Sequence, residues 1–102
     1  MTSPSKRKGN TYERELVQRL REAGFEACRA WGSDGRALGE AAEVDVVADG
    51  MRVQCKRRKQ LAAWLGLGAG VDWVSMRADK GEPVAVLREA DLIRLVRAAG
   101  GW

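Results

Sequence analysis

The chain has 102 residues and a formal net charge of +4, with 45% hydrophobic and 31% charged residues, a balance typical of one small globular domain. It contains no histidine and only two cysteines, which excludes a zinc-type ligand set and the histidine-activated nucleophiles of many hydrolases. No apolar run approaches the roughly 20 residues of a membrane span, and the N-terminus lacks a signal-peptide core, so we expect a soluble, cytoplasmic protein. Any chemistry must therefore use carboxylates, lysine and a hard metal ion.

The first part of the chain predicts a helix that follows a basic arm. Residues 1–9 are polar and basic and predict a flexible arm, which leaves residues 10–102 as a single domain. Asn10 is the expected N-cap of a helix that runs to about Gly24, where glycine ends it. The apolar stripe of this helix consists of Leu16, Val17 and Leu20.

Three strands are expected next. A strand at residues 25–31 is followed by a glycine-rich loop at residues 32–39. The valines within residues 44–47 are strand formers, Asp49-Gly50 is a strong two-residue hairpin turn, and residues 51–56 form the return strand.

The second half predicts two further strands and two helices. Residues 60–67 are almost wholly apolar and predict a short helix, residues 71–77 and 83–88 predict strands, and residues 90–99 predict a closing helix. The element order α-β-β-β-α-β-β-α implies an α/β fold, with a mixed sheet of about five strands flanked by helices.

Polar residues occupy positions where packing residues are expected. Glu13 shares the helical face of the apolar stripe, where an unpaired carboxylate is costly, although Asn10 and Glu13 also fit a capping box. Asp45 lies in a strand among valines, against strand propensity, and a position near the strand edge would also explain it. Gln54 and Lys56 point to one face of the return strand, which a solvent-exposed face alone would also explain.

Taken together, these residues form a candidate site. The helix and both hairpin strands each deliver a polar group that can converge on one point. Oxygens of Glu13, Asp45 and Gln54 would suit Mg²⁺, which also keeps several waters. Lys56 would then lie beside a metal-bound water or a phosphate that carries developing charge.

Two clusters of cations suggest a polyanionic partner. Residues 6–8 precede the first helix and residues 56–59 end the return strand. Such clusters are expected at a phosphate backbone, although a solvated tail and a charged strand end remain alternatives. Cys28 and Cys55 lie in apolar contexts and predict buried thiols rather than a disulfide.

At these residues the chain resembles a known family. Asp45 followed by Gln54-Cys55-Lys56 resembles the PD-(D/E)XK nuclease signature. Lys8-Gly9-x-x-x-Glu13-Arg14, the loop Gly32-Ser33-x-Gly35 and the hairpin are similar to archaeal-type Holliday junction resolvases, including phage-encoded relatives. The resemblance implies a restriction-endonuclease-like fold and metal-dependent phosphodiester hydrolysis. It implies a metal shell of Glu13, Asp45, Gln54 and the Cys55 carbonyl, with Lys56 as catalytic lysine and Ser33 at the scissile phosphate.

Two positions depart from the family pattern. Val44 replaces the proline before the aspartate, and Gln54 replaces the usual glutamate, which removes one negative charge from the metal shell.

We therefore expect a homodimeric endonuclease that depends on Mg²⁺, with Mn²⁺ as a substitute, and that resolves four-way DNA junctions by paired symmetric cuts. Segments 61–67 and 71–76 are the candidate dimer interface. There are two alternatives: a nuclease of the same superfamily with a restriction or repair target, and a non-catalytic DNA-binding module. The expected DNA-binding residues are Lys6, Arg7, Lys8, Arg14, Arg36, Arg57, Arg58 and Lys59.

Overall fold

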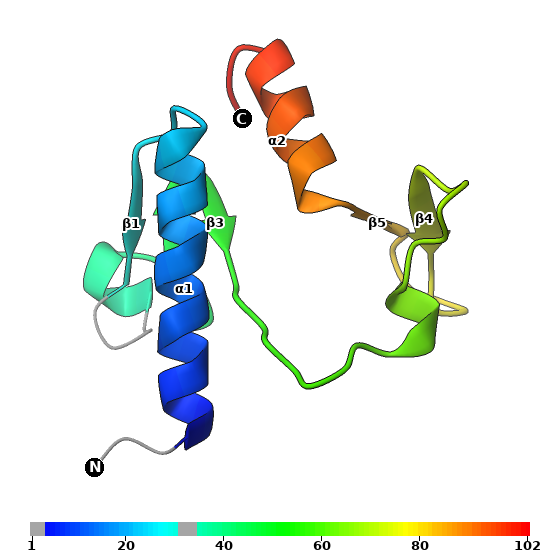
Figure 1. Cartoon of the computed structure of the whole chain (residues 1–102), viewed down its shortest axis with the longest axis horizontal. Helices are drawn as coiled ribbons and strands as arrows, with labels where there is room; N and C mark the ends of the chain where they lie inside the picture. The colour runs from blue at the N-terminus through cyan, green and yellow to red at the C-terminus, as the bar shows by residue number, and fades with distance from the viewer. Residues whose placement is uncertain (1–3, 31–34) are drawn as a thin grey trace. The chain divides into compact units, whose positions relative to one another are not determined.

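The computed structural model describes residues 4–30 and 35–102, and the side chains of residues 10–30, 35–63 and 65–102. The α/β class is confirmed, with two helices and five strands in the described chain (Figure 1). The five strands form two antiparallel sheets, one of three strands and one of two. The elements are α1 (Pro4–Glu22), β1 (Ala27–Arg29), η2 (Gly35–Leu38), β2 (Val46–Ala48), β3 (Met51–Val53), η3 (Ala63–Leu65), β4 (Trp73–Met76), β5 (Val84–Leu87) and α2 (Glu89–Ala98).

The chain divides into two compact units. The first unit comprises residues 1–57 together with Trp102, and the second comprises residues 58–101. A single domain over residues 10–102 stays a prediction. None of the described helices is both long enough and apolar enough to cross a membrane.

In the first unit, α1 packs against the sheet of order β1-β2-β3 (Figure 1). The register aligns Arg29 with Val46 and Val46 with Val53 across the three strands. Alternate residues of these strands face α1 and bury their side chains against its apolar stripe, as the sequence predicted. This core includes Leu16, Val17, Leu20, Phe25, Ala27, Val46, Ala48 and Met51.

The helix α1 begins six residues earlier than the sequence indicated. Because the helix starts at Pro4, Asn10 lies within it, so the prediction that Asn10 is the N-cap was wrong. Residues 6–8 are therefore helical. The predicted stop at Gly24 is confirmed: this glycine has a positive φ of 97°, and the Phe25 amide donates a hydrogen bond of 2.9 Å to the Leu20 carbonyl.

The hairpin turn at Asp49-Gly50 is also confirmed. Both residues have positive φ, 46° and 88°, as a two-residue turn that matches the strand twist requires. The Asp49 carboxylate accepts a hydrogen bond of 2.9 Å from the Glu26 amide, and the Asp49 amide donates one of 3.1 Å to the Glu26 carbonyl. The turn is thereby fastened to the segment that leads into β1.

In the second unit, β4 and β5 form an antiparallel hairpin and α2 follows β5 directly. The predicted helix at residues 60–67 was wrong, since only residues 63–65 form a single 3₁₀ turn. Ala62 and Gly66 on either side of the turn have extended backbones, and one short turn cannot meet the cost of helix nucleation. The loop between η3 and β4 is held by Arg88, which donates hydrogen bonds of 3.0 Å to the carbonyls of Gly68 and Val71.

Candidate functional site

Glu13 is a buried carboxylate in the middle of α1. It is 4% exposed, and its Oε2 lies 3.2 Å from Nε of Arg29 on β1, which donates a hydrogen bond to it. Because Asn10 is inside the helix, the capping box no longer accounts for Glu13. The carboxylate is therefore a charge inside the α1–sheet interface that is retained by pairing with a cation.

Asp45 lies immediately before β2, and its backbone is hydrogen-bonded to the chain on either side, at Ala30 after β1 and at Val53 in β3. Its carbonyl accepts a hydrogen bond of 2.9 Å from the Ala30 amide, and its amide donates one of 2.8 Å to the Val53 carbonyl. Its Oδ2 accepts a third hydrogen bond, of 2.7 Å, from the Cys55 amide. The half-buried carboxylate thus has a fixed position between the chain ends of β1 and β3.

The bond from Cys55 to Asp45 explains why β3 is shorter than the predicted return strand. The Cys55 amide donates to a side chain instead of a backbone carbonyl, so the regular ladder ends at Val53. Gln54 and Lys56 flank Cys55 and are exposed, whereas Val53 and Cys55 are half-buried. The predicted alternation of faces in this segment is therefore confirmed, and the Gln54 and Lys56 side chains are open to solvent.

These hydrogen bonds link, through Arg29 and Ala30, the three segments that carry the candidate residues. Arg29, which holds Glu13, directly precedes Ala30, whose amide is bonded to Asp45. Asp45 in turn is bonded to Cys55, between Gln54 and Lys56. The structure thus connects Glu13, Asp45 and the Gln54–Lys56 segment through backbone and side-chain bonds at one end of the sheet.

Gly35 supports this end of the sheet from the loop. A Cβ atom at this position would lie 2.1 Å from the Ala41 carbonyl oxygen and 2.9 Å from the Val44 Cβ. Only glycine allows the loop to approach the chain directly before Asp45 so closely. The neighbouring loop residue Ser33, a predicted site residue, lies outside the described residues.

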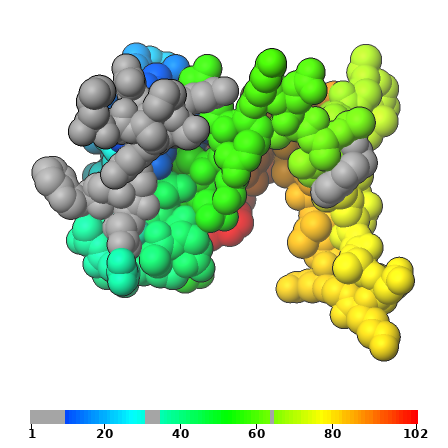
Figure 2. Space-filling view, turned by 90° about the horizontal axis from the view of Figure 1, so that it is seen from below, coloured from blue at the N-terminus to red at the C-terminus, as the bar shows by residue number. Residues whose placement is uncertain are grey.

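The predicted DNA-binding cations are exposed wherever the structure describes their side chains. Arg14 on α1 and Arg36 on η2 are exposed, and so are residues 56–59. The bright green segment around residues 56–60 presents its side chains on the face seen in Figure 2. The side chains of residues 6–8 lie outside the described part of the chain.

Two of the residues that hold the site were missed from the sequence. Arg29 occupies an inward position of β1, two residues after buried Ala27, and a cation at such a position signals an internal carboxylate. Gly35 is part of the Gly32-Ser33-x-Gly35 motif, but the motif alone does not indicate its close contact with the backbone of Ala41. The predicted burial of Cys28 was wrong, since this thiol is exposed on the strand face opposite Arg29; the two cysteines do not form a disulfide bond, as expected.

The donors available for a metal ion are oxygens. The described residues contain no group of three or more histidine, cysteine, aspartate or glutamate side chains that could hold one. Two carboxylates, an amide oxygen and a backbone carbonyl remain, from Glu13, Asp45, Gln54 and Cys55. This set fits a hard cation that keeps several waters and does not fit zinc or copper.

One comparison with known proteins identifies the family. The family model of the archaeal Holliday junction resolvase (Hjc) matches residues 4–60, more than half of the chain. The match covers α1, the three-stranded sheet and the Gln54–Lys56 segment, and it confirms the resemblance drawn from the motifs. No curated protein and no solved structure matches the chain.

Proposed function

Because the chain belongs to the archaeal Holliday junction resolvase family, whose members are nucleases of branched DNA, we propose that it is an Mg²⁺-dependent endonuclease that resolves four-way junctions. The observation that supports this proposal is the Asp45 carboxylate, which is held by the Cys55 amide between exposed Gln54 and Lys56. A carboxylate fixed beside a lysine at an open surface is a suitable arrangement for hydrolysis of a phosphodiester.

Glu13, Asp45, Gln54 and the Cys55 carbonyl are the proposed metal ligands. When bound, Mg²⁺ supplies charge neutralisation at the phosphate and a more acidic water. Asp45 has one oxygen on the Cys55 amide, which restricts its rotation and leaves its other oxygen to serve as a ligand. Mn²⁺ takes the same ligand types and is expected to substitute.

Lys56 is the proposed catalytic lysine. Its exposed ammonium can orient the attacking water or stabilise negative charge that develops on the phosphate. Ser33 is proposed to donate a hydrogen bond to a phosphate oxygen from the glycine-rich loop. The exposed cations Arg14, Arg36 and residues 57–59, with residues 6–8, would bind the backbone of the DNA arms.

A homodimer would place two such sites on one junction. Paired symmetric cuts need two sites related by a two-fold axis, which an isologous dimer supplies. The second unit has large exposed apolar side chains in both segments that the sequence nominated, since Leu61 is 63% exposed and Trp73 is 56% exposed. Val71 and Val84 add to this surface. Exposed apolar surface of this extent in a small unit supports its use as a dimer interface.

The test is cleavage of a four-way junction compared with a linear duplex of the same sequence, in Mg²⁺ and in Mn²⁺. Cutting of the junction alone supports the proposal, and equal cutting of both substrates indicates a nuclease with another target. Junction binding without cutting indicates a DNA-binding module. Lys56→Ala is the control: its rate should fall by about two to three orders of magnitude with binding retained within several-fold.

The dimer is tested separately by Trp73→Glu. A charge placed in an apolar contact should yield monomers that nick junctions without resolving them. Light scattering measures whether the variant is a monomer or a dimer. The ratio of paired to single cuts on a junction shows whether it resolves the junction or only nicks it. A dimer that survives this change would move the interface to α2, where Leu95 is 56% exposed.

A further inference from the structure

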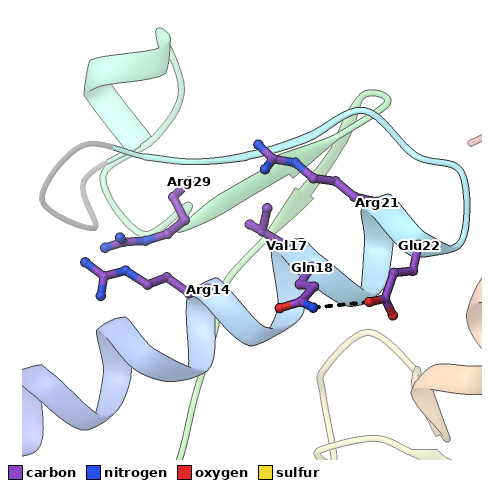
Figure 3. A pocket seen from close by; sticks show the side chains of 6 residues that line it. All are labelled: Arg14, Val17, Gln18, Arg21, Glu22 and Arg29. Atoms are coloured by element: carbon purple, nitrogen blue, oxygen red, sulfur yellow. Dashed lines mark hydrogen bonds between the residues drawn. The ribbon is translucent and has the colours of Figure 1, made fainter.

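An open groove between α1 and β1 lies beside the candidate site but is not used by the proposed chemistry (Figure 3). It has a volume of about 630 Å³. Three of its lining residues are arginines on two different elements, Arg14 and Arg21 on α1 and Arg29 on β1. Among the described residues, the lining consists of Arg14, Val17, Gln18, Arg21, Glu22 and Arg29.

Two of these arginines, Arg21 and Arg29, are held by a hydrogen bond from Nε, which leaves their terminal guanidinium nitrogens available to a ligand in the groove. Nε of Arg29 donates to the Glu13 carboxylate at 3.2 Å, and Nε of Arg21 donates to the Ala27 carbonyl at 3.0 Å. A guanidinium held by Nε still has two terminal nitrogens with four further N–H groups. Because the anchoring bonds restrict these side chains before any ligand binds, less conformational entropy is lost on binding an anion.

The cations of the groove exceed its anions. In Figure 3, Arg14 and Arg29 point toward one another although both are positive. Glu22, the only acidic residue in the described part of the lining, accepts a hydrogen bond of 3.2 Å from Gln18, and Glu13 is buried and bonded to Arg29. Like charges that converge on a concave surface repel, and an anion in the groove would relieve this repulsion.

We propose that this arginine groove binds the sugar–phosphate backbone of the DNA substrate next to the cleavage site, with Arg21 as a contact in addition to Arg14 and Arg29. Arg14 and Arg21 lie seven residues apart on α1, about 10 Å along its axis. Along the axis of a DNA duplex, where each strand has one phosphate per about 3.4 Å, this distance spans roughly three phosphate steps. The planar guanidinium forks suit the bidentate recognition of phosphate oxygens.

The inference rests on the proposed function for its ligand, but its test is independent of cleavage. Binding of a four-way junction is measured by fluorescence anisotropy in EDTA, where metal-dependent cutting cannot occur, over a range of salt concentrations. Arg21→Gln is compared with Arg52→Gln, which removes the same charge from an exposed arginine on the opposite face of the sheet. Thermal unfolding of each variant is measured alongside.

Arg21→Gln should weaken junction binding roughly tenfold, the typical effect of losing one charge-assisted hydrogen bond, while Arg52→Gln changes it little. The slope of log K against log salt should become shallower by up to about 0.9 for Arg21→Gln and unchanged for Arg52→Gln. Arg21→Lys should recover most of the affinity and the slope, because it restores the charge.

Three results would refute the proposal that the groove binds the DNA backbone. Equal losses for Arg21→Gln and Arg52→Gln would show a general charge effect, and an unchanged slope for Arg21→Gln would show no phosphate contact. A loss of affinity that follows the loss of thermal stability, and that Arg21→Lys does not restore, would show a purely structural arginine. A protein that binds through the groove but never cuts would instead refute the proposed catalysis and leave the groove in place.

Discussion

Replacement of Arg29 by glutamine is expected to destabilise the first unit because it leaves the Glu13 carboxylate buried without its cation. The Glu13 side chain is 5% exposed and the Arg29 side chain 24% exposed, with 3.2 Å between Oε2 and Nε. Removal of one partner of a fully buried ion pair costs about 3–5 kcal/mol. Because a quarter of Arg29 is open to water, which weakens the pair, we expect a smaller loss of about 2–3 kcal/mol.

For a domain of this size, such a loss lowers Tm by roughly 10–20 °C. The measurement is thermal unfolding followed by circular dichroism in EDTA, so that no metal ion contributes. Arg52→Gln is the matched control, since Arg52 lies 3.9 Å from Glu40 and its side chain is 67% exposed. Its effect should stay within about 0.5 kcal/mol.

A double-mutant cycle separates the ion pair from general packing. Glu13→Gln combined with Arg29→Gln places two neutral amides of similar size in the interface, so the double variant should be less destabilised than the sum of the two single variants. We expect a coupling energy of about 1–2 kcal/mol. Strict additivity, or an Arg29→Gln variant as stable as the Arg52→Gln control, would refute the view that Arg29 compensates a buried Glu13.

Three further predictions address the site and its surroundings. Gln54→Glu should keep cleavage activity and lower the Mg²⁺ concentration for half-maximal rate, because hard cations prefer carboxylate to amide oxygen; an unchanged Mg²⁺ titration would exclude residue 54 as a ligand. Gly35→Ala should reduce stability by about 1–3 kcal/mol in chemical denaturation, because its Cβ would lie 2.1 Å from the Ala41 carbonyl oxygen, whereas Gly70→Ala, with no atom within 4 Å of the added Cβ, should not. Neutralising residues 6–8 should weaken junction binding and its salt dependence without moving the cut position; an unaltered salt slope would show that this cluster does not bind phosphate.

The elements that the sequence predicted well are those with local signals. The turn at Asp49-Gly50 needs two positive φ angles, and its residues are among the few that adopt them readily. Gly24 ends α1 for a similar reason. The apolar stripe of Leu16, Val17 and Leu20 predicted which face of α1 is buried, because helical periodicity follows from the sequence alone.

The remaining features depend on contacts that local signals do not contain. An Asn three residues before a Glu fits a capping box, but the same spacing also occurs inside a helix, and α1 continues back to Pro4. The apolar composition of residues 60–67 indicated a helix, whereas the 3₁₀ turn at residues 63–65 ends at Gly66, whose backbone is extended. The site was predicted by residue type, but the bonds from Arg29 to Glu13 and from Cys55 to Asp45 join residues 16 and 10 positions apart.

These two bonds also bear on the glutamine at position 54. Without metal, the Glu13 carboxylate is paired with Arg29. The Asp45 carboxylate accepts a hydrogen bond from the Cys55 amide. A third carboxylate at position 54 would have no comparable partner among the bonds described and would add repulsion between like charges. Gln54 therefore avoids a third negative charge beside Glu13 and Asp45 when no cation is bound. We expect this to lower the metal affinity, because the proposed shell contains only two carboxylates and completes its coordination with neutral oxygens and water.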